Sequence, residues 1–163
     1  MAGGIGSRFW PMSRTNYPKQ FLDILNIGRT LIQSTYDRFA KFIPKENIYV
    51  VTFEDYADIV AEQLPELSKA NILCEPSRKN TAPCIAYAAA KIHALDPDAT
   101  LLISPADHLI INEKRFEEII NVAWQTAQSG QLVTLGIEPS RPDTGYGYIE
   151  FAKNENTIKG SAC

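Results

Sequence analysis

Residues 47–74 have the sequence NIYVVTFEDYADIVAEQLPELSKANILC, and this stretch decides the fold. Its two ends, 47–52 and 71–74, are short apolar runs, which predict buried strands. Between them, apolar residues recur at helical spacing and predict a helix over 55–64. A strand, a helix and a second strand in close succession indicate two parallel strands joined by a helical crossover.

The same alternation continues on both sides of this stretch. Apolar residues at three- and four-residue steps predict helices over 30–42 and 113–129, and an alanine-rich helix, capped by Asn80 or Thr81, is expected to run to Leu95. Continuous apolar runs predict strands over 99–104 and 131–136. Such alternation is typical of a parallel sheet covered on both faces by helices. We therefore expect a Rossmann-like α/β fold with three layers (αβα), in which helices cover both faces of a mostly parallel sheet.

The composition is that of an ordinary folded domain. Of 163 residues, 45% are hydrophobic and 21% are charged, with a formal net charge of -3, so we expect one domain over 1–163. No apolar run approaches the roughly 20 residues of a membrane span, and no basic excess favours nucleic acid, so we expect neither partner. Cys74, Cys84 and Cys163 lack metal-binding spacing and are expected to be reduced thiols, the first two in the core, as in a cytoplasmic protein. Neither end of the sequence completes an element, and we expect a piece of a longer protein whose first strand precedes Ala2.

A glycine-rich turn near the start carries the first candidate site. Residues 2–11 (AGGIGSRFWP) hold three glycines at positions 3–6, which allows successive backbone NH groups to surround an anion. Arg8 and Lys19 add two cations, and two cations beside a glycine turn suit a triphosphate. A tight turn with solvated basic residues is the alternative. The turn matches neither the dinucleotide fingerprint, whose last glycine it lacks, nor the phosphate-binding P-loop, whose glycine–lysine pair it lacks.

Three further motifs follow predicted elements. Glu75 begins EPSRKNTAP between a strand and a helix, where polar groups suit a base or an anion, with a simple helix cap as an equally weighted alternative. Asp107, in SPADH after the predicted strand 99–104, suits Mg²⁺ that bridges phosphate oxygens, with a turn residue as the alternative. Residues 143–149 (DTGYGYI) suit a flat polar ligand such as a sugar, or a hairpin turn. Because parallel strands bring their carboxyl ends to one edge, we expect these motifs to form one site.

Together these motifs resemble a known family. The stretch 2–21 (AGGIGSRFWPMSRTNYPKQF), with EPSRKNTAP, SPADH and TGYGYI, is similar to the signature of the sugar nucleotidyltransferases, and most similar to their mannose and guanine branch. The resemblance covers nearly the whole chain. It implies a nucleotide-diphospho-sugar transferase fold, with 1–163 as an N-terminal, nucleotide-binding portion of the catalytic domain. It also implies Mg²⁺-dependent transfer of GMP from GTP to mannose 1-phosphate, giving GDP-mannose and pyrophosphate.

The resemblance assigns roles position by position. It implies nucleotide contacts from a phosphate side and a guanine side, made by Ala2, Gly3, Gly4, Gly6 and Ser7 and by Glu75, Asn80, Thr81 and Pro83. It implies that Arg8 and Lys19 are catalytic, neutralising the phosphates, and that Asp107 binds substrate and Mg²⁺. It implies that the mannose is faced by Gly145, Tyr146 and Gly147. The family supplies a second metal-binding carboxylate from a further sheet portion, so we expect this chain alone to turn over poorly.

Two alternatives remain open at this point. The nearest is another sugar-1-phosphate nucleotidyltransferase, which uses dTTP or UTP with glucose 1-phosphate. The other is a non-catalytic nucleotide-binding domain, which would keep the glycine turn without turnover. The oligomeric state is also open, with a homodimer as one alternative.

Overall fold

The computed structural model describes residues 1–4, 10–77 and 79–150, and the chain divides into two units, Met1–Leu109 and Ile110–Cys163. Three candidate residues, Gly6, Ser7 and Arg8, lie outside the described residues. The expectation of one domain over 1–163 stays a prediction.

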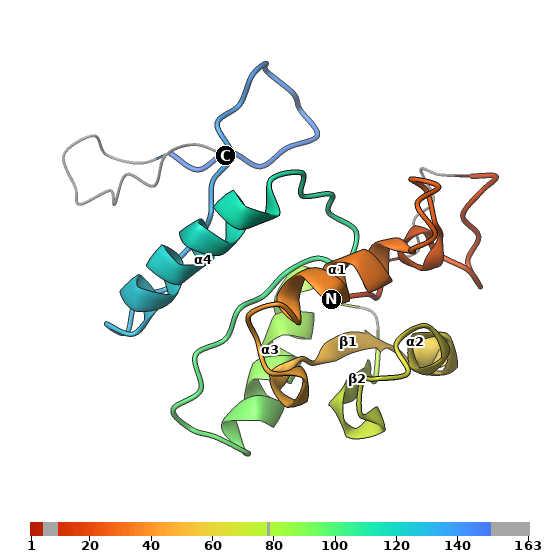
Figure 1. Ribbon diagram of the computed structural model, residues 1–163. Helices are drawn as coiled ribbons and strands as arrows, with labels where there is room; N and C mark the ends of the chain where they lie inside the picture. The colour runs from red at the N-terminus through yellow and green to blue at the C-terminus, as the bar shows by residue number, and fades with distance from the viewer. Residues whose placement is uncertain (5–9, 78, 151–163) are drawn as a thin grey trace. The chain divides into compact units, whose positions relative to one another are not determined.

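The first unit is built on a parallel pair of strands. β1 (Val50–Phe53) and β2 (Ile72–Glu75) pair in parallel register, with Phe53 opposite Glu75 at their carboxyl ends. The helix between them, α2 (Ala57–Gln63), contacts both strands, and Figure 1 shows β1 and β2 side by side next to it. The strand–helix–strand unit predicted from 47–74 is thus confirmed.

Short 3-10 turns lead into several elements of this unit, and they cover Lys19–Phe21, Lys45–Asn47, Glu54–Tyr56 and Lys69–Asn71. The turn at Lys19–Phe21 matters most for the site, because it carries a buried glutamine, Gln20.

Helix α1 (Leu31–Phe39) begins at a reciprocal cap. The hydroxyl oxygen of Thr30 accepts from the backbone NH of Gln33 at 3.4 Å, and the side-chain oxygen of Gln33 accepts from the backbone NH of Thr30 at 3.0 Å. This capping box satisfies two donors that would otherwise have no partner. The helix therefore starts where its sequence pattern predicts and ends a turn earlier.

Aromatic residues hold the segment that follows the glycine-rich turn. Phe21 and Tyr56 are each 1% exposed, and their rings meet edge to face with centroids 5.8 Å apart. The hydroxyl of Tyr56 also donates to the carbonyl oxygen of Thr15 at 2.6 Å. Since these contacts tie residues 15–21 to the start of α2, they fix the backbone on either side of Lys19.

Helix α3 (Thr81–His93) has a proline in its first turn, where the missing NH costs no intrahelical bond. Asn80 is the residue directly before the helix, one of the two predicted cap positions. Its φ is 65° and its side chain makes no capping bond, so the predicted side-chain cap is wrong. Cys84 is buried as expected, whereas Cys74 is only half-buried.

The predicted strand over 99–104 is wrong, although its end is anchored. The nitrogen of Met1 donates to the carbonyl oxygen of Ser104 at 2.9 Å, and the NH of Ala106 donates to the carbonyl oxygen of Met1 at 3.0 Å. Both bonds go to the same residue, Met1. One partner residue does not form a ladder, and an apolar run without a ladder is not a strand.

The second unit is described through residue 150 and contains α4 (Glu113–Ala127). The side-chain oxygen of Asn112 accepts from the NH of Arg115 at 3.0 Å and caps the helix. The predicted helix is confirmed. The predicted strand over 131–136 is wrong: no strand is assigned in the described part of this unit, and Leu132 is fully exposed.

Candidate active site

The start of the glycine-rich turn is fastened to β1. Ala2 is 2% exposed, and its NH donates to the carbonyl oxygen of Val51 at 2.7 Å. Its own carbonyl oxygen accepts from the Thr52 hydroxyl at 3.3 Å and from the side-chain amide of Gln20 at 2.7 Å. The same amide reaches the carbonyl oxygen of Gly4 at 3.1 Å. These bonds hold the turn at the carboxyl end of β1.

A buried carboxylate lies directly behind the turn. Glu75, the last residue of β2, is 8% exposed, and a side chain added at Gly3 would place its Cβ 3.2 Å from Oε2 of Glu75. That distance is tighter than an ordinary contact, so a larger residue at position 3 would require the Glu75 side chain to shift by a few tenths of an ångström. The sequence prediction that the glycine turn and Glu75 belong to one site is supported by this approach, because the two lie far apart in the chain.

Cys84, in the first turn of α3, lies near the same carboxylate. Burial, followed by the proximity of Glu75, raises the pKa of the Cys84 thiol to about 11. The thiol is therefore protonated at neutral pH. Asn80, Thr81 and Pro83, predicted on the guanine side, are exposed just ahead of it, so α3 brings their backbone to the edge where β2 ends.

Lys19 and Asp107 form an ion pair, which joins the 3-10 turn at Lys19–Phe21 to the SPADH segment. Their side chains are 28% and 23% exposed, so both remain accessible to a ligand. The backbone beside Asp107 is held by the hydroxyl of Thr35, which donates to the carbonyl oxygen of Ala106 at 3.3 Å. Two residues predicted separately, one for phosphate and one for metal, are thus brought into contact.

The sugar-side motif lies in the second unit. Asp143 organises a local turn there: its side chain accepts from the NH of Gly145 at 2.9 Å, and its NH and carbonyl oxygen both bond the Tyr148 hydroxyl, at 2.7 and 2.9 Å. Tyr146 is 64% exposed. The structure thus shows a local turn without paired strands, so the hairpin alternative is not observed here, and the assignment of Gly145, Tyr146 and Gly147 to mannose stays a prediction.

The side chains of the site can be compared with the needs of a divalent cation. Among the described residues no three His, Cys, Asp or Glu side chains gather as a metal cluster. Mg²⁺ does not require one, because it usually takes one or two protein carboxylates and completes its shell with water and substrate phosphates. The accessible carboxylate of Asp107 beside a phosphate-suited turn fits that pattern.

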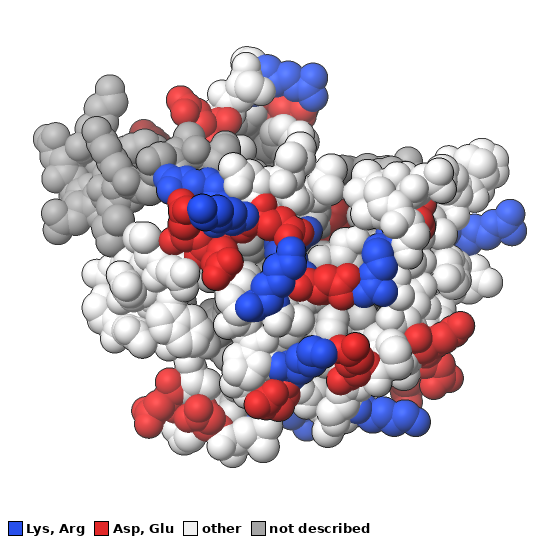
Figure 2. Space-filling model, viewed as in Figure 1, with Lys and Arg blue, Asp and Glu red and all other residues white. Residues whose placement is uncertain are grey.

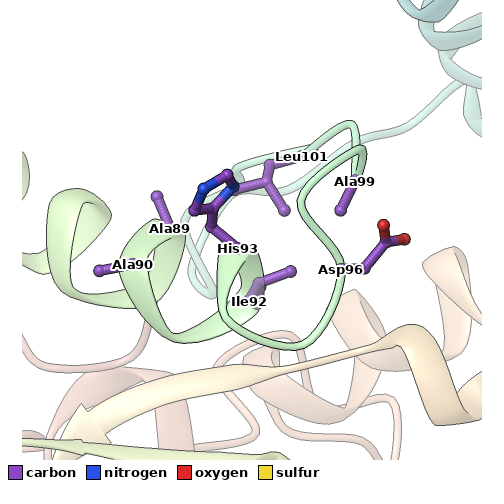
Figure 3. Close-up of a pocket in the computed structure, with 7 residues that line it drawn as sticks. All are labelled: Ala89, Ala90, Ile92, His93, Asp96, Ala99 and Leu101. Carbon is purple, nitrogen blue, oxygen red and sulfur yellow. The ribbon is translucent and has the colours of Figure 1, made fainter.

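A cavity of about 380 Å³ opens at the far end of α3, as Figure 3 shows, and it contains none of the candidate residues. Its walls are mainly small and apolar, formed by Ala89, Ala90, Ile92, His93, Asp96, Ala99 and Leu101. Glu75 and Cys84 lie at the opposite end of the helix. The cavity is therefore separate from the candidate site. His93 is the last residue of α3.

Charged side chains of both signs are mixed on the face of the molecule shown in Figure 2. Among the described residues, Arg29 pairs with Asp37 and Lys45 pairs with Glu66. None of the helices in the described ranges combines the length and the apolar character that a membrane crossing requires. The mixture of positive and negative side chains agrees with the small net charge of -3.

Gln20 is the structural residue that sequence reasoning missed. It is 3% exposed and holds two carbonyl groups of the glycine-rich turn with one side-chain amide. A signal was present, because Gln20 directly follows the candidate lysine within YPKQ. Gln20 reaches Ala2 and Gly4 only because residues 18–21 fold back toward the turn, and the hydrophobic periodicity of the sequence does not indicate that fold-back.

Comparison with known proteins places this site in context. Residues 1–160 match the nucleotidyl transferase family. The mannose-1-phosphate guanylyltransferase of Escherichia coli is 46% identical over 152 residues, and the alignment covers 92% of this chain and 32% of that protein. The same-named protein of Salmonella montevideo is 48% identical over 151 residues, covering 91% and 31%. The alginate biosynthesis protein AlgA of Pseudomonas aeruginosa is 42% identical over 162 residues, covering 98% and 33%.

The chain therefore spans about a third of the length of these relatives. Among solved structures, the crystal structure of mannose-1-phosphate geranyltransferase from Thermus thermophilus superposes with a TM-score of 0.77 at 35% identity, covering 92% of this chain and 45% of that chain. The expected fold class is confirmed as an incomplete α/β nucleotide-diphospho-sugar transferase fold.

Proposed function

The chain belongs to the nucleotidyl transferase family, and on that premise we propose that it carries the GTP-binding part of an enzyme that transfers GMP to mannose 1-phosphate, giving GDP-mannose and pyrophosphate. The similarity to proteins named mannose-1-phosphate guanylyltransferase supports the choice of substrates. Because the chain spans about a third of those relatives, the proposal is limited to the substrate contacts that residues 1–163 can make.

One observation carries this proposal: the glycine-rich turn, a cation and a carboxylate meet at the carboxyl end of the parallel strands. The turn begins at Ala2, which is fastened to β1, and Gly3 lies against Glu75 at the end of β2. The ion pair of Lys19 and Asp107 adds one charge of each sign. The crevice outside the carboxyl ends of strands is where open α/β sheets bind nucleotides.

The reaction needs no covalent enzyme intermediate. A phosphate oxygen of mannose 1-phosphate is already anionic at neutral pH and attacks the α-phosphorus of GTP, while the bond from that phosphorus to the departing pyrophosphate oxygen breaks. Catalysis then consists of aligning the two substrates and stabilising the charge that develops on pyrophosphate. We assign this stabilisation to Lys19, which offers a compact ammonium, and to Arg8, which offers a forked guanidinium.

The remaining roles follow the family assignment. Backbone NH groups of the turn over residues 2–7 would contact the nucleotide phosphates, and residues 75–83 would border the guanine. Residues 145–147 would face the mannose. Cys74 and Cys84 are free thiols, which fits a cytoplasmic location for the enzyme.

Mg²⁺ is part of the proposal, and Asp107 is the residue of the described part that we expect to hold it. When bound, the ion would supply positive charge to the phosphate oxygens. The carboxylate of Asp107 suits this task because it is a hard oxygen ligand and is 23% exposed.

The test is a calorimetric titration of this chain with GTP and separately with dTTP, each with Mg²⁺ present. We expect tighter binding of GTP, and weaker GTP binding by Asp107→Asn. Asp37→Asn is the matched control, because Asp37 also pairs with a basic residue but belongs to none of the candidate motifs. Tighter binding of dTTP would reject the guanine branch, and absence of binding to either nucleotide would reject the proposed function for this chain.

A further inference from the structure

The ion pair between Lys19 and Asp107 joins two segments that are each held firmly by other contacts. Lys19 is followed by the buried Gln20, whose amide bonds the glycine-rich turn at 2.7 and 3.1 Å. Asp107 follows Ala106, which is 5% exposed and bonded through its NH to Met1 at 3.0 Å. The backbone at both ends of the ion pair is thus held by contacts other than the pair itself.

Each partner of this pair is also the group that a different ligand needs. A divalent cation would bind the Asp107 carboxylate, and a triphosphate would bind the Lys19 ammonium. While the two side chains are in contact, the ammonium reduces the negative charge that a cation experiences, and the carboxylate repels a phosphate. Both side chains are about a quarter exposed, so this competition takes place where bulk water screens it only in part.

We propose that the Lys19–Asp107 ion pair is the resting state of the site and couples divalent cation binding to triphosphate binding, because each ligand releases the side chain that the other requires. The inference rests on the proposed function and adds a regulation of the same site. Coupling of this kind is reciprocal: the factor by which the cation strengthens nucleotide binding equals the factor by which the nucleotide strengthens cation binding.

The first test measures the cation alone. Mn²⁺ is titrated into the nucleotide-free chain and followed by electron paramagnetic resonance, for the wild type, Lys19→Met and Lys19→Arg. We expect Lys19→Met to bind Mn²⁺ at least about fivefold more tightly, the lower end of typical coupling factors. Lys19→Arg keeps the positive charge and should remain near the wild type. Unchanged or weaker Mn²⁺ binding by Lys19→Met would overturn the proposal.

A matched control removes a different ion pair in the same unit. Lys45→Met breaks the pair of Lys45 with Glu66, which makes the same chemical change at a pair whose side chains are more than half exposed. We expect it to leave Mn²⁺ affinity unchanged. An equal gain in both variants would show that the effect comes from net charge alone and would overturn the proposal.

The second test measures metal-free GTP in the presence of a chelator. We expect Asp107→Asn to bind it more tightly than the wild type, because Lys19 is released for the phosphates. Simple repulsion by Asp107 predicts a gain too, so the same substitution is also made in the Lys19→Met background, where we expect little gain. An equal gain in both backgrounds, or no gain in either, would overturn the coupling.

The two tests separate this inference from the function on which it rests. If GTP fails to bind in any condition while Lys19→Met still strengthens Mn²⁺ binding, the proposed function is wrong and the competition at Asp107 stands. If GTP binds with Mg²⁺ as proposed while Lys19→Met leaves the Mn²⁺ affinity unchanged, the function stands and the coupling is wrong. Circular dichroism of each variant verifies that its helices are retained.

Discussion

Replacement of Gln20 by methionine should loosen the glycine-rich turn while leaving the core filled. Gln20 is 3% exposed, and its amide donates to the carbonyl oxygens of Ala2 at 2.7 Å and Gly4 at 3.1 Å. Methionine has a similar length and fills the same space, so the substitution removes two hydrogen bonds without opening a large cavity. The Ala2 carbonyl keeps the Thr52 hydroxyl as a partner at 3.3 Å. At a net value of about 0.5–1.5 kcal/mol for each lost bond, we expect a loss of about 1–3 kcal/mol in the free energy of unfolding.

The assay is urea unfolding followed by circular dichroism, with the exposed Gln131→Met as a control expected to change stability by less than about 0.5 kcal/mol. A second variant sharpens the result. Gln20→Glu keeps the shape, but its carboxylate would face two carbonyl oxygens without a proton to donate. The pKa of this carboxyl group in the folded state should therefore be raised. The Gln20→Glu variant should then lose stability as the pH rises through that pKa. Wild-type stability of Gln20→Glu at neutral pH would refute the assigned role of Gln20.

Three further outcomes are expected. Asn80→Gly should raise the free energy of unfolding by about 1 kcal/mol, because the φ of 65° at Asn80 is strained for a residue with a side chain; a loss of stability in urea unfolding would contradict this. Thr30→Ala should lower the same quantity by about 1 kcal/mol through loss of the α1 cap, while Thr30→Ser should retain most of the stability. Cys84 should resist iodoacetamide at pH 8, where a thiol with a pKa of about 11 is ionised in about one molecule in a thousand, and rapid labelling of its peptide in mass spectrometry would refute its burial.

Local patterns predicted those elements whose stabilising contacts are local or lie within one strand–helix–strand unit. Helix α1 has its cap residue and its apolar stripe within a dozen positions, and α2 packs on the two strands that flank it in the chain. The glycine-rich turn, Glu75 and Asp107 were all identified from residue type and position. Their assembly was predicted as well, from the rule that parallel strands end at one edge.

What the patterns did not predict depends on partners distant in sequence. The apolar run 99–104 has the composition of a strand, yet a strand exists only where a neighbour completes its hydrogen bonds. Asn80 has the side chain of a helix cap, but its backbone is at positive φ and its side chain makes no capping bond. The contact of Lys19 with Asp107 could not be predicted from either motif alone. The Lys19 motif indicated a phosphate and the Asp107 motif indicated a metal ion, and neither indicated an ion pair between the two residues.

The short segment Met1–Gly4 explains why these distant residues meet. On one side the NH of Ala2 bonds β1 at Val51, and on the other Met1 exchanges two bonds with Ser104 and Ala106. This segment therefore occupies the position of a strand between β1 and the SPADH segment. Within this segment Gly3 lies against Glu75 at the end of β2, and the bond from Ala106 to Met1 holds the residue next to Asp107. One short segment thus brings Glu75 and the Lys19–Asp107 pair to the same edge of the strands, which is why motifs that lie far apart in the sequence can contribute to one site.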